Sequence, residues 1–262
     1  MHQEIFLTYL YCFCDQPVEL PAFSFERPLQ LLPVGKNYAV IENVSSKDFS
    51  ELALQKNMAE MDWLLPKVNL HESVVQDLMN KATVLPIKFA TIFSTDNNIV
   101  ELYNANKADY EDNFKKLKGK QEWGIKVYSA ADDSWLLQQA NDKEINEAKE
   151  MLASATPGKA FLMKKKIQGL INRKKSEINK TLGSELYRAL KTGTVESLQK
   201  SILPAQTDTD NDSKLILNSV FLLEKGAVEQ WLANIQNVET ELGNDKIVFD
   251  VTGPWPPYHF VG

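Results

Sequence analysis

The chain has 262 residues, of which 44% are hydrophobic and 24% are charged, and its formal net charge is -6 at pH 7. This composition is typical of a soluble globular protein with apolar material for one large or two ordinary domains. The acidic balance argues against nucleic acid as a partner. We expect no lipid membrane span and no secretory signal, because no apolar run is long enough and Met1–Glu4 lacks a basic start.

Cysteine usage favours a reducing compartment. The only cysteines are Cys12 and Cys14, which share a face of a predicted strand at a spacing poorly suited to a disulfide. Two thiols are also too few for a zinc site. We therefore expect buried, reduced side chains in a cytoplasmic protein.

The first part of the chain, residues 1–120, is expected to form one α+β domain. Its first strand is apolar on both faces and should be central in its sheet, with Tyr9, Tyr11 and Phe13 sharing one face. Pro66 should interrupt the following helical pattern. The expected elements are strand 4–13, a proline-rich loop, strand 38–44, helical segments 46–65 and 70–79, strand 83–93 and helix 97–118.

Residues 121–252 are expected to form a second domain with the βαββαβ order of a ferredoxin-like fold. Its expected elements are strand 123–128, helix 159–190, strand 197–205, strand 214–223, helix 227–242 and strand 247–251. Gly169 and Gly183 should each weaken the long helix by about 1 kcal/mol relative to alanine. The two domains should meet near Lys118–Glu122.

The carboxy-terminal tail, residues 253–262, differs in character from the strand before it. Gly253 should end that strand, and the prolines of 254–257 should hold the tail extended, because proline has a fixed φ and no N–H. The candidate residues for a structural clamp are Trp255, Tyr258 and Phe260. We expect the tail to dock on the same chain near the domain junction, since a stiff aromatic segment loses little entropy on docking.

No complete set of catalytic, cofactor-binding or metal-binding residues stands out. His71 begins a pattern similar to a zinc-protease helix, but Val75 occupies the second histidine position. The acidic stretch 207–213 lacks the glycine and distal glutamate of a calcium loop, so a solvated connection is favoured over cation binding. We expect no catalytic residue, no cofactor and no metal, and structural roles for Trp63, His71 and Trp123.

One predicted helix carries a basic face within an acidic chain. The candidate partner-contact residues are Lys164, Lys165, Lys166, Arg173, Lys174 and Lys175. A solvated helix surface explains such a face most simply. The alternative is a docking face for an acidic partner, or for the chain's own acidic stretch at 132–150.

Several segments together resemble the gas vesicle protein L/F family (GvpL/GvpF). They are MDWL at 61–64, HESVV at 71–75, VLPIKFATIF at 84–93, EWGIKV at 122–127 and GPWPPYHF at 253–260. Their order and spacing extend over nearly the whole chain, which makes the resemblance specific. One departure is Ala90, where many relatives have glycine, and this difference bears on local backbone freedom.

The resemblance implies a non-enzymatic accessory or minor structural protein of gas vesicles, the hollow buoyancy organelles. Such proteins are expected to associate with the small hydrophobic shell protein and with other gas vesicle accessory proteins, to limit shell-protein aggregation and to help nucleation. The implied location is the gas vesicle or the cytoplasm, with no cofactor. The alternative is an enzyme or small-ligand-binding protein on a ferredoxin-like scaffold, which a deep pocket with converging titratable groups would favour.

Overall fold

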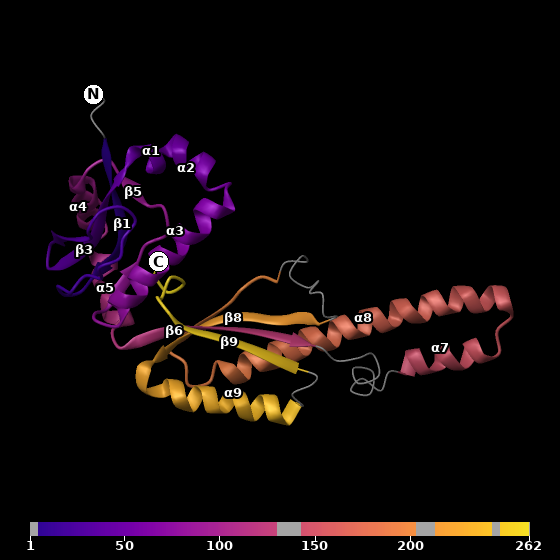
Figure 1. Ribbon diagram of the computed structural model, residues 1–262. Coiled ribbons are helices and arrows are strands. Elements are labelled where there is room, and N and C mark those ends of the chain that lie inside the picture. The colour runs from indigo at the N-terminus through magenta and orange to yellow at the C-terminus, as the bar shows by residue number, and fades with distance from the viewer. Residues whose placement is uncertain (1–4, 130–142, 203–212, 243–246, 262) are drawn as a thin grey trace. The chain divides into compact units, whose positions relative to one another are not determined.

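The computed structural model describes residues 5–129, 143–202, 213–242 and 247–261. Its contacts divide the chain into two compact units: Met1–Glu122 with Pro254–Gly262, and Trp123–Gly253. Helices and strands occur in both units, and the strands form two sheets (Figure 1). The protein is therefore an α+β protein, as predicted.

The first unit is built on a sheet with strand order β2-β3-β1-β4, in which β5 also pairs with β1. Its elements are β1 (Phe6–Cys14), β2 (Gln30–Val34), β3 (Asn37–Ser45), α1 (Ser46–Phe49), α2 (Glu51–Asn57), α3 (Met61–Met79), β4 (Val84–Pro86), β5 (Ile92–Phe93), α4 (Asp96–Ala105) and α5 (Lys107–Leu117). Strand β1 lies between β3 and β4, so the prediction of a central first strand is confirmed.

A β-bulge in β1 corrects the predicted assignment of its faces. The register against β3 shifts between Leu10 and Cys12, and one extra residue reverses the alternation beyond it. Cys12 consequently joins the cluster that contains Tyr9 and Tyr11, whereas Phe13 packs against aromatic rings of α4 and α5. Both cysteines are buried and free.

Proline has less effect on the first unit than the sequence predicted. The proline-rich loop contains β2, whose edge position tolerates Pro33 because an edge strand has unpaired N–H groups. Pro66 lies inside α3 instead of interrupting it. As the sixth residue of α3, Pro66 removes one i→i−4 hydrogen bond. The buried face of α3, which includes Val74 and Leu78 and packs on the sheet, offsets this loss.

Two further predicted elements are split in the structure. The strand expected over 83–93 is two short strands, β4 and β5, each paired with β1. The helix expected over 97–118 is interrupted at Asn106, where α4 ends and α5 begins. The Asn106 side chain donates to the carbonyl of Leu102 at 2.9 Å, a local bond that competes with a continuous helix.

The second unit contains a sheet with strand order β7-β8-β6-β9. Its elements are β6 (Lys120–Ser129), α7 (Lys143–Ala153), α8 (Pro157–Leu190), β7 (Glu196–Gln199), β8 (Lys214–Glu224), η2 (Lys225–Ala227), α9 (Val228–Leu242) and β9 (Ile247–Trp255). The end of α8 and the face of α9 form one core with the sheet, while the earlier part of α8 packs against α7, as Figure 1 shows.

Strand β9 continues beyond the predicted end at Gly253 to Trp255. It lies at the edge of its sheet, where Pro254 does not interrupt a central ladder. Gly253 has a φ of 137°, a value that favours glycine. The strand therefore leads directly into the tail.

Gly183 is required by the close contact between α8 and β8. A Cβ atom at Gly183 would lie 2.3 Å from the carbonyl oxygen of Ile216, whereas one at Gly169 would meet nothing within 4 Å. We expect Gly183→Ala to destabilise the second unit by about 1–3 kcal/mol, because a backbone oxygen cannot move aside cheaply. The matched change Gly169→Ala should stabilise it by about 0.5–1 kcal/mol. Chemical denaturation of both variants tests this, and equal effects would contradict it.

Candidate functional site

The carboxy-terminal tail packs on the first unit through several polar contacts. The hydroxyl of Tyr258 lies 3.0 Å from Nε2 of His71. The backbone N–H of His259 donates to the carboxylate of Glu122 at 3.0 Å, and its Nδ1 lies 2.6 Å from the same carboxylate. Lys116 donates to the carbonyl of Phe260 at 3.2 Å. Residues near the end of the chain thus contact α3, α5 and the start of β6.

The sequence predicted an extended tail, but the structure shows that the tail is not extended throughout. The N–H of Tyr258 donates to the carbonyl of Pro256, and the N–H of Phe260 donates to the carbonyl of Pro257, so the chain turns after the prolines. Of the three candidate clamp residues, Phe260 is 2% exposed and Trp255 is 40% exposed, while Tyr258 is half-buried. The turn directs the phenylalanine and the tyrosine inward.

His71 is the centre of a buried hydrogen-bond network. Its Nε2 lies 3.1 Å from the carbonyl of Ile87 and its Nδ1 lies 2.8 Å from the hydroxyl of Tyr9. A carbonyl only accepts, so Nε2 carries the proton and Nδ1 accepts from Tyr9. The backbone N–H of Ala90 donates to the Tyr9 hydroxyl oxygen at 3.0 Å. The hydroxyl of Tyr258 lies near the same Nε2 atom, so both ring nitrogens of His71 have partners.

This network makes the stability of the first unit depend on pH. Burial lowers the pKa of His71 from 6.5 to about 4, so the unfolded chain binds a proton more readily than the folded one between these values. The free energy of unfolding has its full value above pH 6.5. It decreases by up to about 3 kcal/mol as the pH falls from 6.5 to 4. We expect His71→Gln to weaken folding at pH 7 and to flatten this dependence, as measured by urea denaturation across the range. An unchanged pH slope would contradict the assignment.

A second buried group, the carboxylate of Glu42 on β3, was not identified from the sequence. Glu42 is fully buried and accepts hydrogen bonds from the hydroxyl of Tyr11 at 2.7 Å. It also accepts from the backbone N–H groups of Phe25, Glu26 and Arg27 at 3.0, 2.6 and 2.9 Å. The available signal was an acidic residue directly after the apolar run Ala39–Ile41 of the predicted strand. This carboxylate holds the loop before β2 against the sheet.

Ala90 has a φ of 63°, in the left-handed region where an L-residue is strained by roughly 1–2 kcal/mol. This is the position where the sequence analysis noted a departure from the glycine of the family that the chain resembles. We expect Ala90→Gly to stabilise the first unit by about 0.5–1 kcal/mol, since part of the relief is offset by the greater freedom of glycine in the unfolded chain. A rise in thermal midpoint would support this expectation, and a fall would contradict it.

The predicted basic face on α8 is partly engaged within the chain. Arg173 lies 3.1 Å from the carboxylate of Glu144 on α7, and Lys174 lies 3.3 Å from that of Glu177. The Lys165 ammonium lies 5.0 Å from the centre of the Phe161 ring. Arg173 therefore contacts the acidic stretch that the sequence offered as one docking partner.

Exposed apolar side chains mark two further surfaces that sequence reasoning did not identify. The first, here called the α2–α3 apolar surface, comprises Leu52, Met58, Met61 and Leu65. The second, here called the α7–α8 apolar surface, comprises Met151, Phe161 and Leu162. Leu52 is 80% exposed and Leu162 is 67% exposed. Large apolar side chains left exposed on neighbouring elements are candidates for protein contact sites.

The remaining predicted residues occupy packed positions. Trp63 contacts the ring of Phe49, and Trp123 contacts the ring of Trp231. Within the residues that the structure describes, no group of three His, Cys, Asp or Glu side chains is placed to hold a metal ion. No helix in these described ranges has the length and apolar character needed to cross a bilayer.

Comparison with solved structures shows the same fold in two gas vesicle proteins. The crystal structure of GvpF from Microcystis aeruginosa matches 98% of this chain and 99% of its own, with a TM-score of 0.69 and 18% identity. The crystal structure of GvpF from Anabaena sp. PCC7120 matches 98% of each chain, with a TM-score of 0.74 and 15% identity.

Sequence comparisons point to the same family. Gas vesicle protein L of Streptomyces sp. (strain CB03234) is 25% identical over 240 residues, or 90% of this chain and 84% of the relative. Gas vesicle protein L of Haloferax mediterranei is 23% identical over 180 residues, or 68% of this chain and 55% of the relative. The family model described as gas vesicle synthesis protein GvpL/GvpF matches residues 7–262. The chain therefore belongs to the GvpL/GvpF family of gas vesicle proteins.

Proposed function

We propose that the protein is an accessory or minor structural protein of gas vesicles. In this proposal it associates with the small hydrophobic shell protein, limits its aggregation and supports nucleation and assembly of the vesicle. The observation that carries the proposal is the family match over residues 7–262. The role is non-catalytic, and the names of the relatives, which are gas vesicle proteins, support this.

The α2–α3 apolar surface is the proposed contact for the shell protein. Met61 and Leu65 are 57% and 50% exposed, and their spacing places them on one face of α3. Burying such side chains against a hydrophobic partner gains about 25 cal/mol for each Å² removed from water. Methionine side chains are adaptable, which suits contact with repeated shell subunits.

The basic residues of α8 are proposed to steer an acidic partner surface toward the protein. Their attraction is screened beyond a Debye length of roughly 8 Å at physiological salt. Charge reversal by Lys165→Glu should therefore slow association most at low ionic strength, whereas Lys225→Glu, an exposed site elsewhere in the second unit, should have less effect. Equal binding of parent and Lys165→Glu at low salt would remove α8 from the proposal.

The second unit is proposed to be a ferredoxin-like domain. Its element order, apart from the added α7, is βαββαβ, and its strands are arranged β7-β8-β6-β9. This order supports the split βαβ arrangement. The tail, through Tyr258 and Phe260, is proposed to act as a structural clamp on the first unit.

Co-purification with the shell protein, followed by cross-link mapping, tests the proposed function. We expect the parent protein to capture the shell protein and the double change Leu52→Gln/Met61→Gln to reduce capture several-fold. Val248→Gln removes an exposed apolar side chain from β9 and serves as the matched control. Absence of shell protein from the parent's complexes would overturn the proposal, and an equal loss in the control would exclude the α2–α3 apolar surface.

A further inference from the structure

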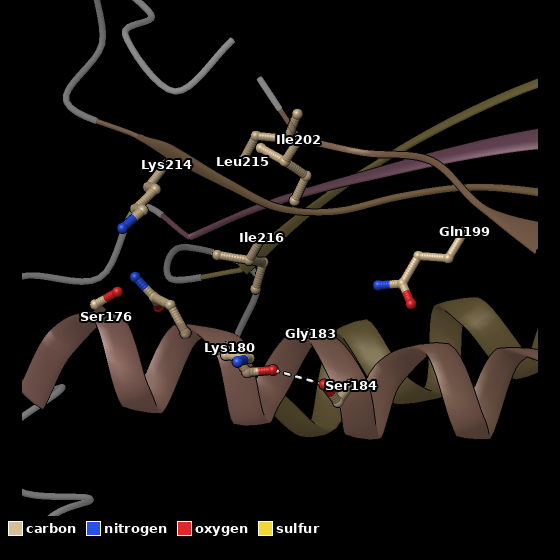
Figure 2. A pocket seen from close by; sticks show the side chains of 10 residues that line it. Ser176, Lys180, Gly183, Ser184, Gln199, Ile202, Lys214, Leu215 and Ile216 are labelled. Atoms are coloured by element: carbon tan, nitrogen blue, oxygen red, sulfur yellow. Dashed lines mark hydrogen bonds between the residues drawn. The ribbon is translucent and has the colours of Figure 1, made fainter. Parts of the chain in front are cut away.

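A pocket with a volume of about 350 Å³ lies between α8, the end of β7 and the beginning of β8. Figure 2 shows side chains of α8 facing those of the two strand ends across it. The polar residues that line the pocket are Ser176, Asn179, Lys180, Ser184, Gln199 and Lys214. Its volume lies in the range of small-ligand sites, about 300–1,000 Å³.

The helix face that lines this pocket is polar, although it lies against a sheet. Ser176, Asn179, Lys180, Gly183 and Ser184 all line the pocket, and their spacing of three and four residues places them along one side of α8. The same side touches β8, because Gly183 packs directly on a backbone carbonyl. A helix face packed on a sheet is ordinarily apolar, as it is one turn later at Leu186 and Leu190. Packing alone therefore does not explain the polar residues.

Asn179 provides an independent indication of a ligand. Its side chain is 6% exposed, and its Oδ1 atom is buried without a hydrogen-bond partner in the part of the chain that the structure describes. A buried acceptor without a donor costs about 1–3 kcal/mol, and such groups are few in native proteins. A ligand that brings an N–H or O–H group into the pocket would supply the missing donor.

The charges around the pocket specify the rest of the ligand. Lys180 and Lys214 both line it, and none of the described residues that line it is acidic. Within the described ranges, neither ammonium group forms an ion pair with a carboxylate. Ser176, the first of the α8 residues that line the pocket, adds a hydroxyl that can donate to an anion. Two cations and a hydroxyl around one cavity favour a carboxylate or phosphate group.

We infer that this pocket is an anion-binding site for a carboxylate or phosphate group that carries a neighbouring hydrogen-bond donor. The anion pairs with Lys180 and Lys214, and the donor bonds to Oδ1 of Asn179. Either an acidic peptide segment, whose backbone N–H is the donor, or a small hydroxylated or protonated anion has this chemistry. The inference does not depend on the shell-protein contact proposed above, which uses a different unit of the chain.

Titration of the full chain at low ionic strength, followed by amide chemical shifts, tests the site. The probes are inorganic phosphate and the peptide Gly-Glu-Glu-Gly, acetylated and amidated at its ends, with identically blocked Gly-Gln-Gln-Gly as the uncharged control peptide. We expect saturable shifts confined to the pocket-lining parts of α8 and β8. The double change Lys180→Gln/Lys214→Gln should weaken binding by at least about tenfold. Lys191→Gln/Lys225→Gln removes the same charge from exposed sites of the second unit outside the pocket and should leave binding nearly unchanged.

A third variant separates the donor contact from the charge. Asn179→Leu removes the amide acceptor without changing any charge. It should therefore weaken binding of the peptide and of protonated phosphate, while the long-range attraction between the lysines and the anion is preserved. Stronger binding of the acidic peptide would identify a peptide segment as the ligand source, and stronger binding of phosphate would identify a small anion. The inference fails if neither probe saturates up to about 10 mM, ten times a millimolar Kd. It also fails if the two lysine pairs have equal effects.

Discussion

Replacing Glu42 with glutamine is expected to destabilise the first unit by about 3 kcal/mol or more. One carboxylate oxygen accepts from Tyr11 and Phe25, and the other accepts from Glu26 and Arg27. Whichever oxygen becomes an amide NH₂, at least one backbone N–H then faces another donor. The remaining bonds lose a charged acceptor, and hydrogen bonds to charged groups contribute about 1.5–3 kcal/mol each.

Urea denaturation of Glu42→Gln at pH 7 measures this effect. Glu101→Gln is the matched control, because Glu101 is an exposed residue of α4 that accepts from Asn97 at 2.6 Å. Exposed interactions of this kind contribute little, so the control should change stability by less than about 0.5 kcal/mol. If the two variants had the same stability, the buried carboxylate would not hold the loop in place.

Removal of the tail is expected to lower the thermal stability of the first unit substantially. Phe260 is 2% exposed, and truncation of a buried phenylalanine costs about 3–5 kcal/mol. Deletion of 256–262 also removes the hydroxyl of Tyr258 beside His71 and both bonds from His259 to Glu122. The expected loss is a large share of the roughly 5–15 kcal/mol that stabilises a folded domain.

Calorimetry of the deletion variant and of Phe260→Ala tests the clamp. Trp255→Ala is the control within the same segment, because its side chain is 40% exposed and its removal should cost much less. A deletion variant that unfolds at the parent's temperature but no longer captures the shell protein would make the tail a recognition peptide. That result would contradict the proposed clamp.

The sequence predicted the order of most elements but not their local irregularities. The nearly continuous apolar run of β1 predicted a central strand, since both of its faces are hydrophobic. The bulge after Leu10 could not be predicted, because only the pairing with β3 shows the extra residue. Pro66 was similarly misleading, because the cost of one proline depends on its position in the helix and on the packing of the other residues.

The buried polar groups were harder to predict than the elements. Glu42 is a single polar residue in a strand pattern and Asn179 is one in a helix pattern, and neither pattern shows whether the polar side chain is buried or exposed. Their roles depend on partners or neighbours distant in the chain, such as the loop N–H groups around Glu42 and Lys214 near Asn179. The departure from glycine at Ala90 was noted as bearing on local backbone freedom, and Ala90 has a positive φ in the structure.

The solubility of the shell protein, expressed with and without this chain, tests the proposed function most directly. If the protein associates with the shell protein and limits its aggregation, the soluble fraction should rise with the parent chain. It should rise less with Leu52→Gln/Met61→Gln, while Val248→Gln should match the parent. A shell protein that is equally insoluble in the presence and absence of the parent chain would contradict the proposal.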